Sequence, residues 1–245
     1  MSALMGSSTR AVLTSLAATG LAVAAYLSWP GFVAAAGAAT LIFAVGWAML
    51  LGLPAARGTI VVLVGATLAA FGAVLVGGDL RYLAVVMALG VGAAFVHELA
   101  RRDGRPRLVE SLAGTVTGLA VVCSGAGWAA LGPGVIEVAL VLCAAIALAA
   151  ASACTAIRLG PWREALITMG VTTVVGAVAG LALLTSIGAL TGALVGLATG
   201  TLTAALHILL GRYPTAGRFP AGLAAAMLPI VVVGIPVYVV DRLFL

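Results

Sequence analysis

The sequence contains no lysine, asparagine or glutamine, and only 8% of its 245 residues are Asp, Glu, Lys or Arg. A soluble domain carries roughly 25% charged residues. Hydrophobic residues instead make up 64% of the chain, and its mean hydropathy is +1.28. A surface of this composition does not stay in water, which excludes a soluble enzyme, a disordered protein and a secreted disulfide-stabilised domain. The composition predicts an integral membrane protein.

Cysteine is also scarce, and Cys123, Cys143 and Cys154 all fall inside apolar runs. An odd number of cysteines within such segments is typical of small packing residues and argues against a disulfide framework or a metal site. The absence of lysine excludes a Walker phosphate-binding loop, which needs one. We therefore expect no metal and no cofactor.

Nine apolar segments are separated by proline, glycine and charge clusters. Each is close to the roughly 20 residues that a membrane-spanning helix needs. The connections are short, which predicts a single all-α polytopic domain over 1–245 with no soluble part. The predicted spans are 11–28, 32–53, 59–77, 82–99, 108–131, 135–157, 165–184, 187–210 and 221–240.

The arginines predict the orientation of the chain. If the N-terminus lies inside, ten of the twelve fall in inner segments, and only Arg81 and Arg242 lie outside. Cytoplasmic loops of membrane proteins carry such a positive excess. We expect an uncleaved first span, the N-terminus inside and the C-terminus outside, in the bacterial cytoplasmic membrane. The net charge of +5 then indicates contact with anionic lipid headgroups and not with nucleic acid.

Residues in the inner loops recur along the chain. The offset is 107 residues for the prolines, 110 for the histidines and 111 for the last arginines. This predicts two parallel four-helix repeats, 32–131 and 135–240, with 11–28 unpaired; such repeats occur in transporters. Chance similarity between Ala/Gly/Val-rich spans is the alternative. The paired positions are Pro54 and Pro161, Arg57 and Arg163, His97 and His207, Arg102 and Arg212, and Arg107 and Arg218.

Gly188, Gly192, Gly196 and Gly200 follow one another at every fourth residue of the eighth predicted span. A row of small residues on one helix face allows another helix to approach closely. The row predicts tight helix packing. The alternatives are an interface with a protein partner or a second copy of the chain, and a sliding surface that lines a path.

The densest charged segment runs over residues 97–111, with the sequence HELARRDGRPRLVES. Its guanidinium groups match phosphate in a bidentate manner, which predicts binding of an anionic substrate or headgroup. A loop that only sets orientation and pairs with its own acids is one alternative, and catalysis by Glu98, Asp103 and Glu110 is another. Histidine titrates near neutral pH, so both histidines are added as lesser candidates. The candidate residues are Arg101, Arg102, Arg105, Arg107, Arg212, His97 and His207.

Two enzyme signatures begin in this segment and then fail. His97-Glu98 starts like the zinc motif H-E-x-x-H, but residue 101 is arginine. Asp103-Gly104 starts like the D-G-x-x-A-R motif of CDP-alcohol phosphotransferases, but residues 107–108 are Arg-Leu. No ionisable residue falls near the middle of a predicted span, where ion-coupled transporters usually place one. The sequence thus favours facilitated or partner-driven movement and leans against an enzyme.

The segment from His97 to Ser111 resembles a loop in uncharacterised bacterial multi-pass membrane proteins that are often labelled permeases. The resemblance covers about fifteen residues and implies membrane location only. The leading hypothesis is a permease-like protein that transports or binds a small or lipid-linked substrate, with an anion as the favoured chemistry. The alternatives are a non-catalytic subunit or scaffold of an envelope-assembly or transporter complex, and a membrane-embedded lipid-modifying enzyme.

Overall fold

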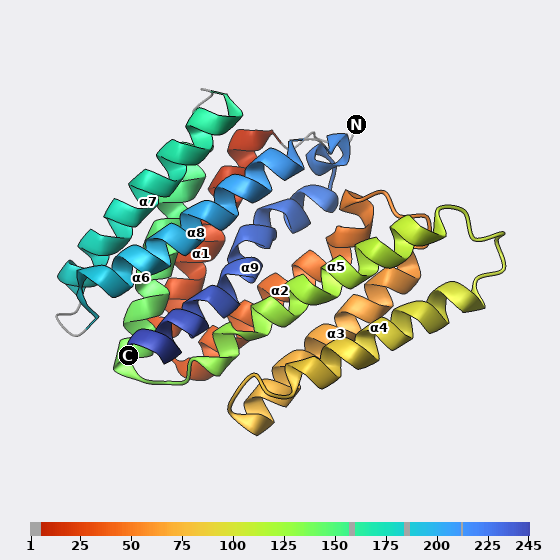
Figure 1. Ribbon diagram of the computed structural model, residues 1–245, viewed down its shortest axis with the longest axis horizontal. Coiled ribbons are helices and arrows are strands. Elements are labelled where there is room, and N and C mark those ends of the chain that lie inside the picture. The colour runs from red at the N-terminus through yellow and green to blue at the C-terminus, as the bar shows by residue number, and fades with distance from the viewer. Residues whose placement is uncertain (1–5, 157–159, 184–186, 212) are drawn as a thin grey trace.

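The computed structural model describes residues 6–156, 160–183, 187–211 and 213–245. Within these residues the chain forms nine long helices and two short 3₁₀ helices, with no strand (Figure 1). All nine are long and apolar enough to cross a membrane, which confirms the all-α multi-pass fold. The helices are α1 (Ser7–Leu27), α2 (Trp29–Leu50), α3 (Ala56–Gly77), α4 (Leu83–Ala100), α5 (Leu108–Ala126), η1 (Trp128–Ala130), α6 (Val135–Cys154), α7 (Pro161–Leu183), α8 (Gly188–Leu210), η2 (Pro214–Gly217) and α9 (Ala221–Phe244).

Helix boundaries differ from the prediction where proline begins a helix. Residues 29–31 were expected to connect two spans, but they form the first turn of α2. The Ser28 side chain caps that turn by accepting a hydrogen bond from the Gly31 backbone N–H at 3.2 Å. Likewise α7 begins at Pro161 and not at residue 165. Proline suits the first turn of a helix because the N–H it lacks would be unpaired there.

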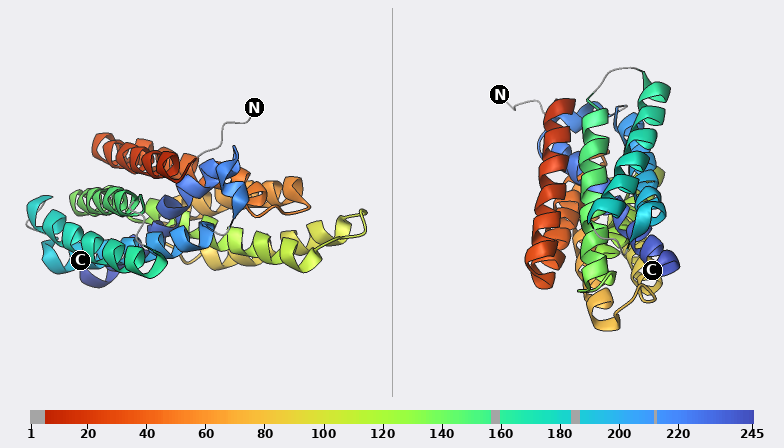
Figure 2. Two further views of the ribbon diagram at one scale, coloured as in Figure 1. Left: turned by 90° about the horizontal axis from the view of Figure 1, so that it is seen from above. Right: turned by 90° about the vertical axis from the view of Figure 1, so that its left-hand side faces the viewer.

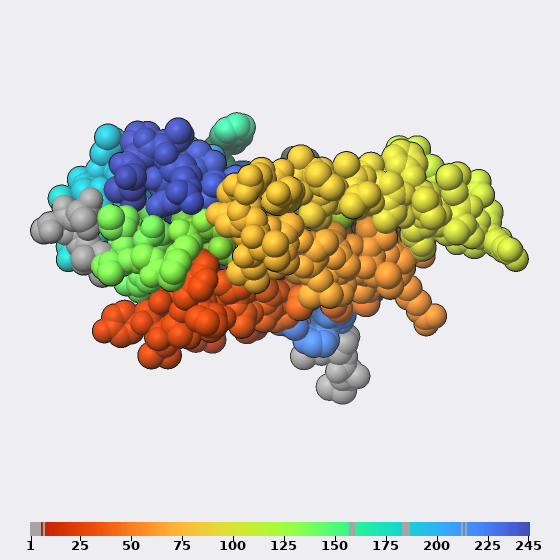
Figure 3. Space-filling view, turned by 90° about the horizontal axis from the view of Figure 1, so that it is seen from below, coloured from red at the N-terminus to blue at the C-terminus, as the bar shows by residue number. Residues whose placement is uncertain are grey.

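The helices form an elongated bundle with two three-helix groups at its ends (Figures 1 and 2). Helices α3, α4 and α5 pack on one another in the first group, and α6, α7 and α8 do so in the second. Helices α2 and α9 lie between the groups and contact each other. Helix α1 covers α2, α6 and α9. Figure 3 shows the first group, in yellow and orange, extending along the long axis away from the second.

The predicted repeats can be compared contact by contact. The pairs α2–α3, α3–α4, α4–α5 and α2–α5 have counterparts in α6–α7, α7–α8, α8–α9 and α6–α9. The remaining contact differs, because α3 packs on α5 in the first copy whereas α6 packs on α8 in the second. The internal duplication stays a prediction.

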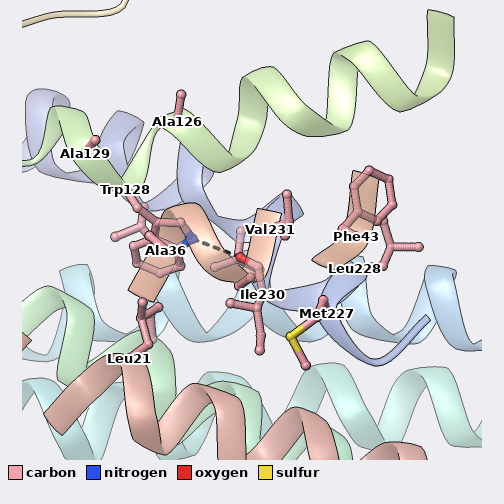
Figure 4. Packing of buried hydrophobic residues seen from close by; sticks show 14 of the residues in the cluster. Leu21, Ala36, Phe43, Ala126, Trp128, Ala129, Met227, Leu228, Ile230 and Val231 are labelled. Carbon is pink, nitrogen blue, oxygen red and sulfur yellow. Dashed lines mark hydrogen bonds between the residues drawn. The ribbon is translucent and has the colours of Figure 1, made fainter. Parts of the chain in front are cut away.

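The buried core lies around α9, in which 67% of an 18-residue apolar stretch is buried, against 22% of the corresponding stretch in α4. The Trp128 indole N–H donates to the Ile230 backbone carbonyl at 2.9 Å (Figure 4). The Trp128 ring also meets Phe32 edge-on, with the ring centroids 6.1 Å apart. The buried indole thus has its polar atom satisfied while its rings fill the core. This contact joins η1 and α2 to the central helix.

Two prolines lie inside α9, yet the helix is continuous. Pro236 cannot donate to the Val232 carbonyl four residues earlier, and the Ser124 hydroxyl of α5 donates to that carbonyl at 2.7 Å. Near Pro229, the Thr14 hydroxyl of α1 donates to the Ala226 carbonyl at 2.7 Å. At Pro236 a neighbouring helix therefore satisfies the carbonyl that the proline leaves free, which water cannot reach within a membrane. The Ala226 carbonyl is one residue past the Ala225 carbonyl that Pro229 leaves free.

The glycine row of α8 packs against α7 of the same chain. A Cβ atom at Gly196 would collide with the Thr172 carbonyl oxygen, and one at Gly192 would collide with that of Gly176. Gly200 faces the Thr172 side chain in the same way. Tight packing within the chain, one of the predicted uses of the row, is the arrangement observed.

Candidate functional site

Charge is distributed unevenly between the two ends of the helices, that is, between the two faces of the bundle at which the helices begin and end. One of these ends contains the start of α1 and the loops that follow α2, α4, α6 and α8. At this end the Thr215 hydroxyl of η2 donates to the Leu50 carbonyl at 2.5 Å. We call it the arginine-rich end. Among the described residues it has eight arginines against four acids, whereas the opposite end has two arginines and three acids. The eight arginines are Arg10, Arg57, Arg101, Arg102, Arg105, Arg107, Arg163 and Arg218, and Arg158 and Arg212 lie outside the described residues.

The loop between α4 and α5 projects from this end (Figure 1) and is anchored by Glu98, whose side chain is 4% exposed. Arg101 donates to one Glu98 carboxylate oxygen at 2.6 Å, and the Ser111 hydroxyl donates to the other at 2.5 Å. Arg101 also donates to Asp103 at 2.8 Å. The hydrogen bonds to Asp103 and Glu98 raise the pKa of Arg101, and the same Arg101 contact lowers the pKa of Asp103. The network joins the end of α4 to the start of α5.

Arg105 and Arg107 also have partners within the chain. Arg105 donates to the Leu99 carbonyl at 2.7 Å. Arg107 donates to Glu110 at 2.7 Å and to the Gly52 carbonyl at 3.1 Å. Three of the four arginines of the loop thus have partners within the chain, and Arg101 and Arg107 pair with acids of the same loop, as one of the predicted alternatives expects.

Arg102 differs from the other arginines of the loop. It is exposed, and its side chain contacts no described residue through a hydrogen bond or an ion pair. It is thus the arginine of the loop that an external anion can reach without breaking a contact. Arg212, its counterpart in the predicted repeat, lies outside the described residues.

The two histidines do not form a pair with each other. The His97 ring lies against Gly58 at the start of α3, and its buried Nε2 atom has no hydrogen-bond partner among the described residues. The Nε2 atom of His207 lies 3.9 Å from a Glu164 carboxylate oxygen at the start of α7. Each histidine thus belongs to a different three-helix group.

A crevice opens between α2, α5 and α8 near the arginine-rich end, with a volume of about 380 Å³. Arg107 and Glu110, both at least half exposed, lie at its mouth. Deeper in, the Trp47 indole donates to the Gly114 carbonyl at 2.8 Å, so the polar atom of that wall is already satisfied. The crevice therefore has an ionic mouth and an apolar interior. Its other lining residues are Leu51, Leu53, Ala113, Thr117, Leu209 and Tyr213.

A smaller polar cavity of about 50 Å³ lies between α1, α6, α8 and α9. Arg10, Ser152, Thr203 and His207 line it. In the sequence Arg10 indicates only orientation, because a lone arginine before an apolar run has no partner nearby in the chain. Arg10 and Thr14 are four residues apart, so they share one face of α1, and this spacing is the sequence signal for a polar face at the start of that helix.

No family model, no curated protein and no solved structure matches this chain. Within the described residues, no three His, Cys, Asp or Glu side chains are close enough together to hold a metal ion.

Proposed function

We propose that this multi-pass membrane protein is permease-like and binds an anionic lipid or lipid-linked anion at its arginine-rich end. The observation that carries the proposal is the crevice between α2, α5 and α8, which combines apolar walls with an arginine at its mouth. Such a shape fits a molecule with an acyl chain and a charged headgroup.

The dimensions of the crevice support this assignment. Its lining extends from Arg107, just before α5, to Thr117 within it, a rise of ten residue steps or about 15 Å at 1.5 Å per residue. An acyl chain placed there would contact apolar side chains, while its phosphate would compete with Glu110 for Arg107. Exposed Arg102 adds a second guanidinium in the same loop, and arginine pairs well with phosphate.

The location follows from the same charges. Anionic headgroups of a cytoplasmic leaflet attract basic residues near the membrane surface. We place the arginine-rich end, and with it the N-terminus, at the cytoplasmic face of a bacterial inner membrane. Because no ionisable side chain was expected at the middle of a span, we propose facilitated or partner-driven movement of the substrate.

The two other functional classes receive less support. A scaffold that uses the glycine row as its interface conflicts with the burial of that row against α7. An enzyme that uses Glu98, Asp103 and Glu110 would need at least one of them available, whereas each is held by an arginine of the same loop.

A matched pair of threonine variants tests the proposal. Thr117 lines the crevice, whereas Thr201 of α8 does not. Both are exposed and donate to the carbonyl four residues earlier, at 2.8 Å and 2.7 Å. We expect Thr117→Trp to fill the crevice and displace bound phosphatidylglycerol in native mass spectrometry, and Thr201→Trp to leave lipid retention unchanged.

A second comparison separates the charge from the cavity. The triple variant Arg102→Ala, Arg105→Ala, Arg107→Ala should lose phosphatidylglycerol but keep phosphatidylcholine, because only the former needs a positive partner. Equal lipid retention in wild type, Thr117→Trp and the triple variant would contradict the proposal. Transbilayer movement of the retained lipid in reconstituted vesicles then tests the transport step.

A further inference from the structure

The cavity between α1, α6, α8 and α9 contains an arginine that has no partner among the described residues. Arg10 lies in the first turn of α1, and its Nη1 atom is buried with no hydrogen-bond partner among the described residues. Its guanidinium makes no ion pair with any described carboxylate. Arg10 is partly buried, and keeping its Nη1 atom away from water without a hydrogen bond costs free energy, so this atom favours an acceptor in the cavity beside it.

The opposite wall of the cavity supplies a second unsatisfied group. Thr203 is 4% exposed, and its hydroxyl also has no partner among the described residues. Buried polar atoms in folded proteins nearly always have a hydrogen-bond partner. An unpaired guanidinium and an unpaired hydroxyl, contributed by α1 and α8 to one cavity, together indicate a missing acceptor.

The electrostatic surroundings select an anion as that acceptor. No Asp or Glu is among the described lining residues of the cavity; Glu164 of α7 contacts His207 at 3.9 Å but is not part of the wall. Arg10 is also at the N-terminal end of α1, where the helix dipole is positive. The positive potential of the arginine is thus reinforced and not neutralised by its neighbours.

We propose that this cavity is a binding site for a small inorganic anion of the size of chloride or bromide. Arg10 supplies the charge, Thr203 donates a hydrogen bond, and Ser152 and His207 complete the polar wall. A volume of about 50 Å³ accepts such an ion with one or two waters, since a water needs roughly 10–15 Å³ of this kind of space. The site shares no lining residue with the lipid crevice, so it does not depend on the proposed function.

Thermal unfolding in detergent tests the site with bromide and chloride as probes. At constant ionic strength, replacing gluconate by chloride or bromide should raise the apparent Tm of the wild type, because an ion that binds only the folded state stabilises it. Arg10→Gln and Thr203→Val should each reduce or abolish this halide-dependent shift. Arg57→Gln, which removes an exposed arginine that lines neither the cavity nor the crevice, should retain the full shift.

A structural measurement accompanies the thermal one. In crystals grown with bromide, an anomalous peak should lie beside Arg10 in the wild type and be absent in Arg10→Gln. If Arg10→Gln does not fold, Thr203→Val and Arg10→Lys still decide the question, because the lysine keeps the charge and should keep the ion. A cavity occupied by water alone, or an equal halide effect in wild type and both cavity variants, would overturn the proposal.

Discussion

The two three-helix groups of this protein are held together in different ways. The group α3–α5 is joined by polar contacts: the Ser111 hydroxyl of α5 donates to the buried Glu98 carboxylate of α4 at 2.5 Å, and the hydroxyls of Thr59 and Thr115 lie 3.0 Å apart. The group α6–α8 is joined by close backbone approach along the α8 glycine row. One group relies on a few directional contacts and the other on a continuous surface.

This difference has a visible consequence for packing. Between α3 and α4 lies an open groove of about 320 Å³, whose lining includes large side chains such as Val61 and Leu89 and small residues such as Gly65 and Gly90. In the counterpart pair α7–α8, Gly192 and Gly196 of α8 lie directly against backbone atoms of α7, so these two helices approach closely. In lipid, where helix association gains little from the hydrophobic effect, both small residues and polar bonds can provide the attraction. The stability of the first group should therefore depend most on its buried polar side chains, and that of the second on its glycines.

The largest expected effect is in the polar group. Glu98→Gln removes a buried carboxylate and should reduce the free energy of unfolding by about 3 kcal/mol, the lower part of the range for breaking a buried pair, because Asp103 still contacts Arg101. Glu110→Gln breaks a pair that is at least half exposed and should cost less than about 1 kcal/mol. Unfolding titrations with SDS in mixed micelles measure both. Similar losses for the two variants would show that the buried pair does not hold the group.

The next effect tests the glycine contact. Gly196→Ala places a methyl group against the Thr172 carbonyl and should destabilise the protein by about 1–3 kcal/mol. Gly65→Ala, at a position of α3 where no atom lies within 4 Å of the new Cβ, should be neutral or stabilising by up to about 1 kcal/mol. The same titrations report the difference. A destabilising Gly65→Ala would mean that α3 and α4 pack more tightly than the groove indicates.

A smaller effect compares two buried threonines. Thr59→Val removes the bond to Thr115 and should cost about 1 kcal/mol. Thr199 of α8 is equally buried, but its hydroxyl has no partner among the described residues, so Thr199→Val should be neutral or slightly stabilising. If Thr199→Val is the more destabilising change, then the polar bonds are not specific to the first group.

The smallest effect is a dependence on pH in the α4–α5 loop. Arg101 holds the pKa of Asp103 below its ordinary value, so this carboxylate contributes stability above its unfolded pKa of about 4 and loses it as the pH falls through the folded value. The wild type should therefore lose a little more stability than Asp103→Asn between pH 5 and the acid limit of the titration. Parallel pH profiles of the two proteins would contradict this assignment.

Much of the candidate site could be anticipated from the segment 97–111. Its arginines and acids are close in sequence, so their mutual ion pairs form over one turn of chain, as Arg101 does with Glu98 and Asp103. The Arg107 contact to the Gly52 carbonyl could not be anticipated, because it joins residues 55 positions apart. The cavity beside Arg10, whose Nη1 atom has no partner among the described residues, could not be anticipated either, because residues of α8 and α9 form its other walls.

The sequence by itself determined that the chain is a bundle of nine membrane-length helices with most of its arginines at one end. These properties depend on composition and on the spacing of apolar runs, which act locally along the chain. The tertiary structure alone decided that the glycine row faces α7, that the crevice forms between α2, α5 and α8, and that Arg10 is enclosed with Thr203. Each of these depends on which helices are neighbours, and in a chain of similar apolar spans that choice rests on side-chain shape between residues far apart in the sequence.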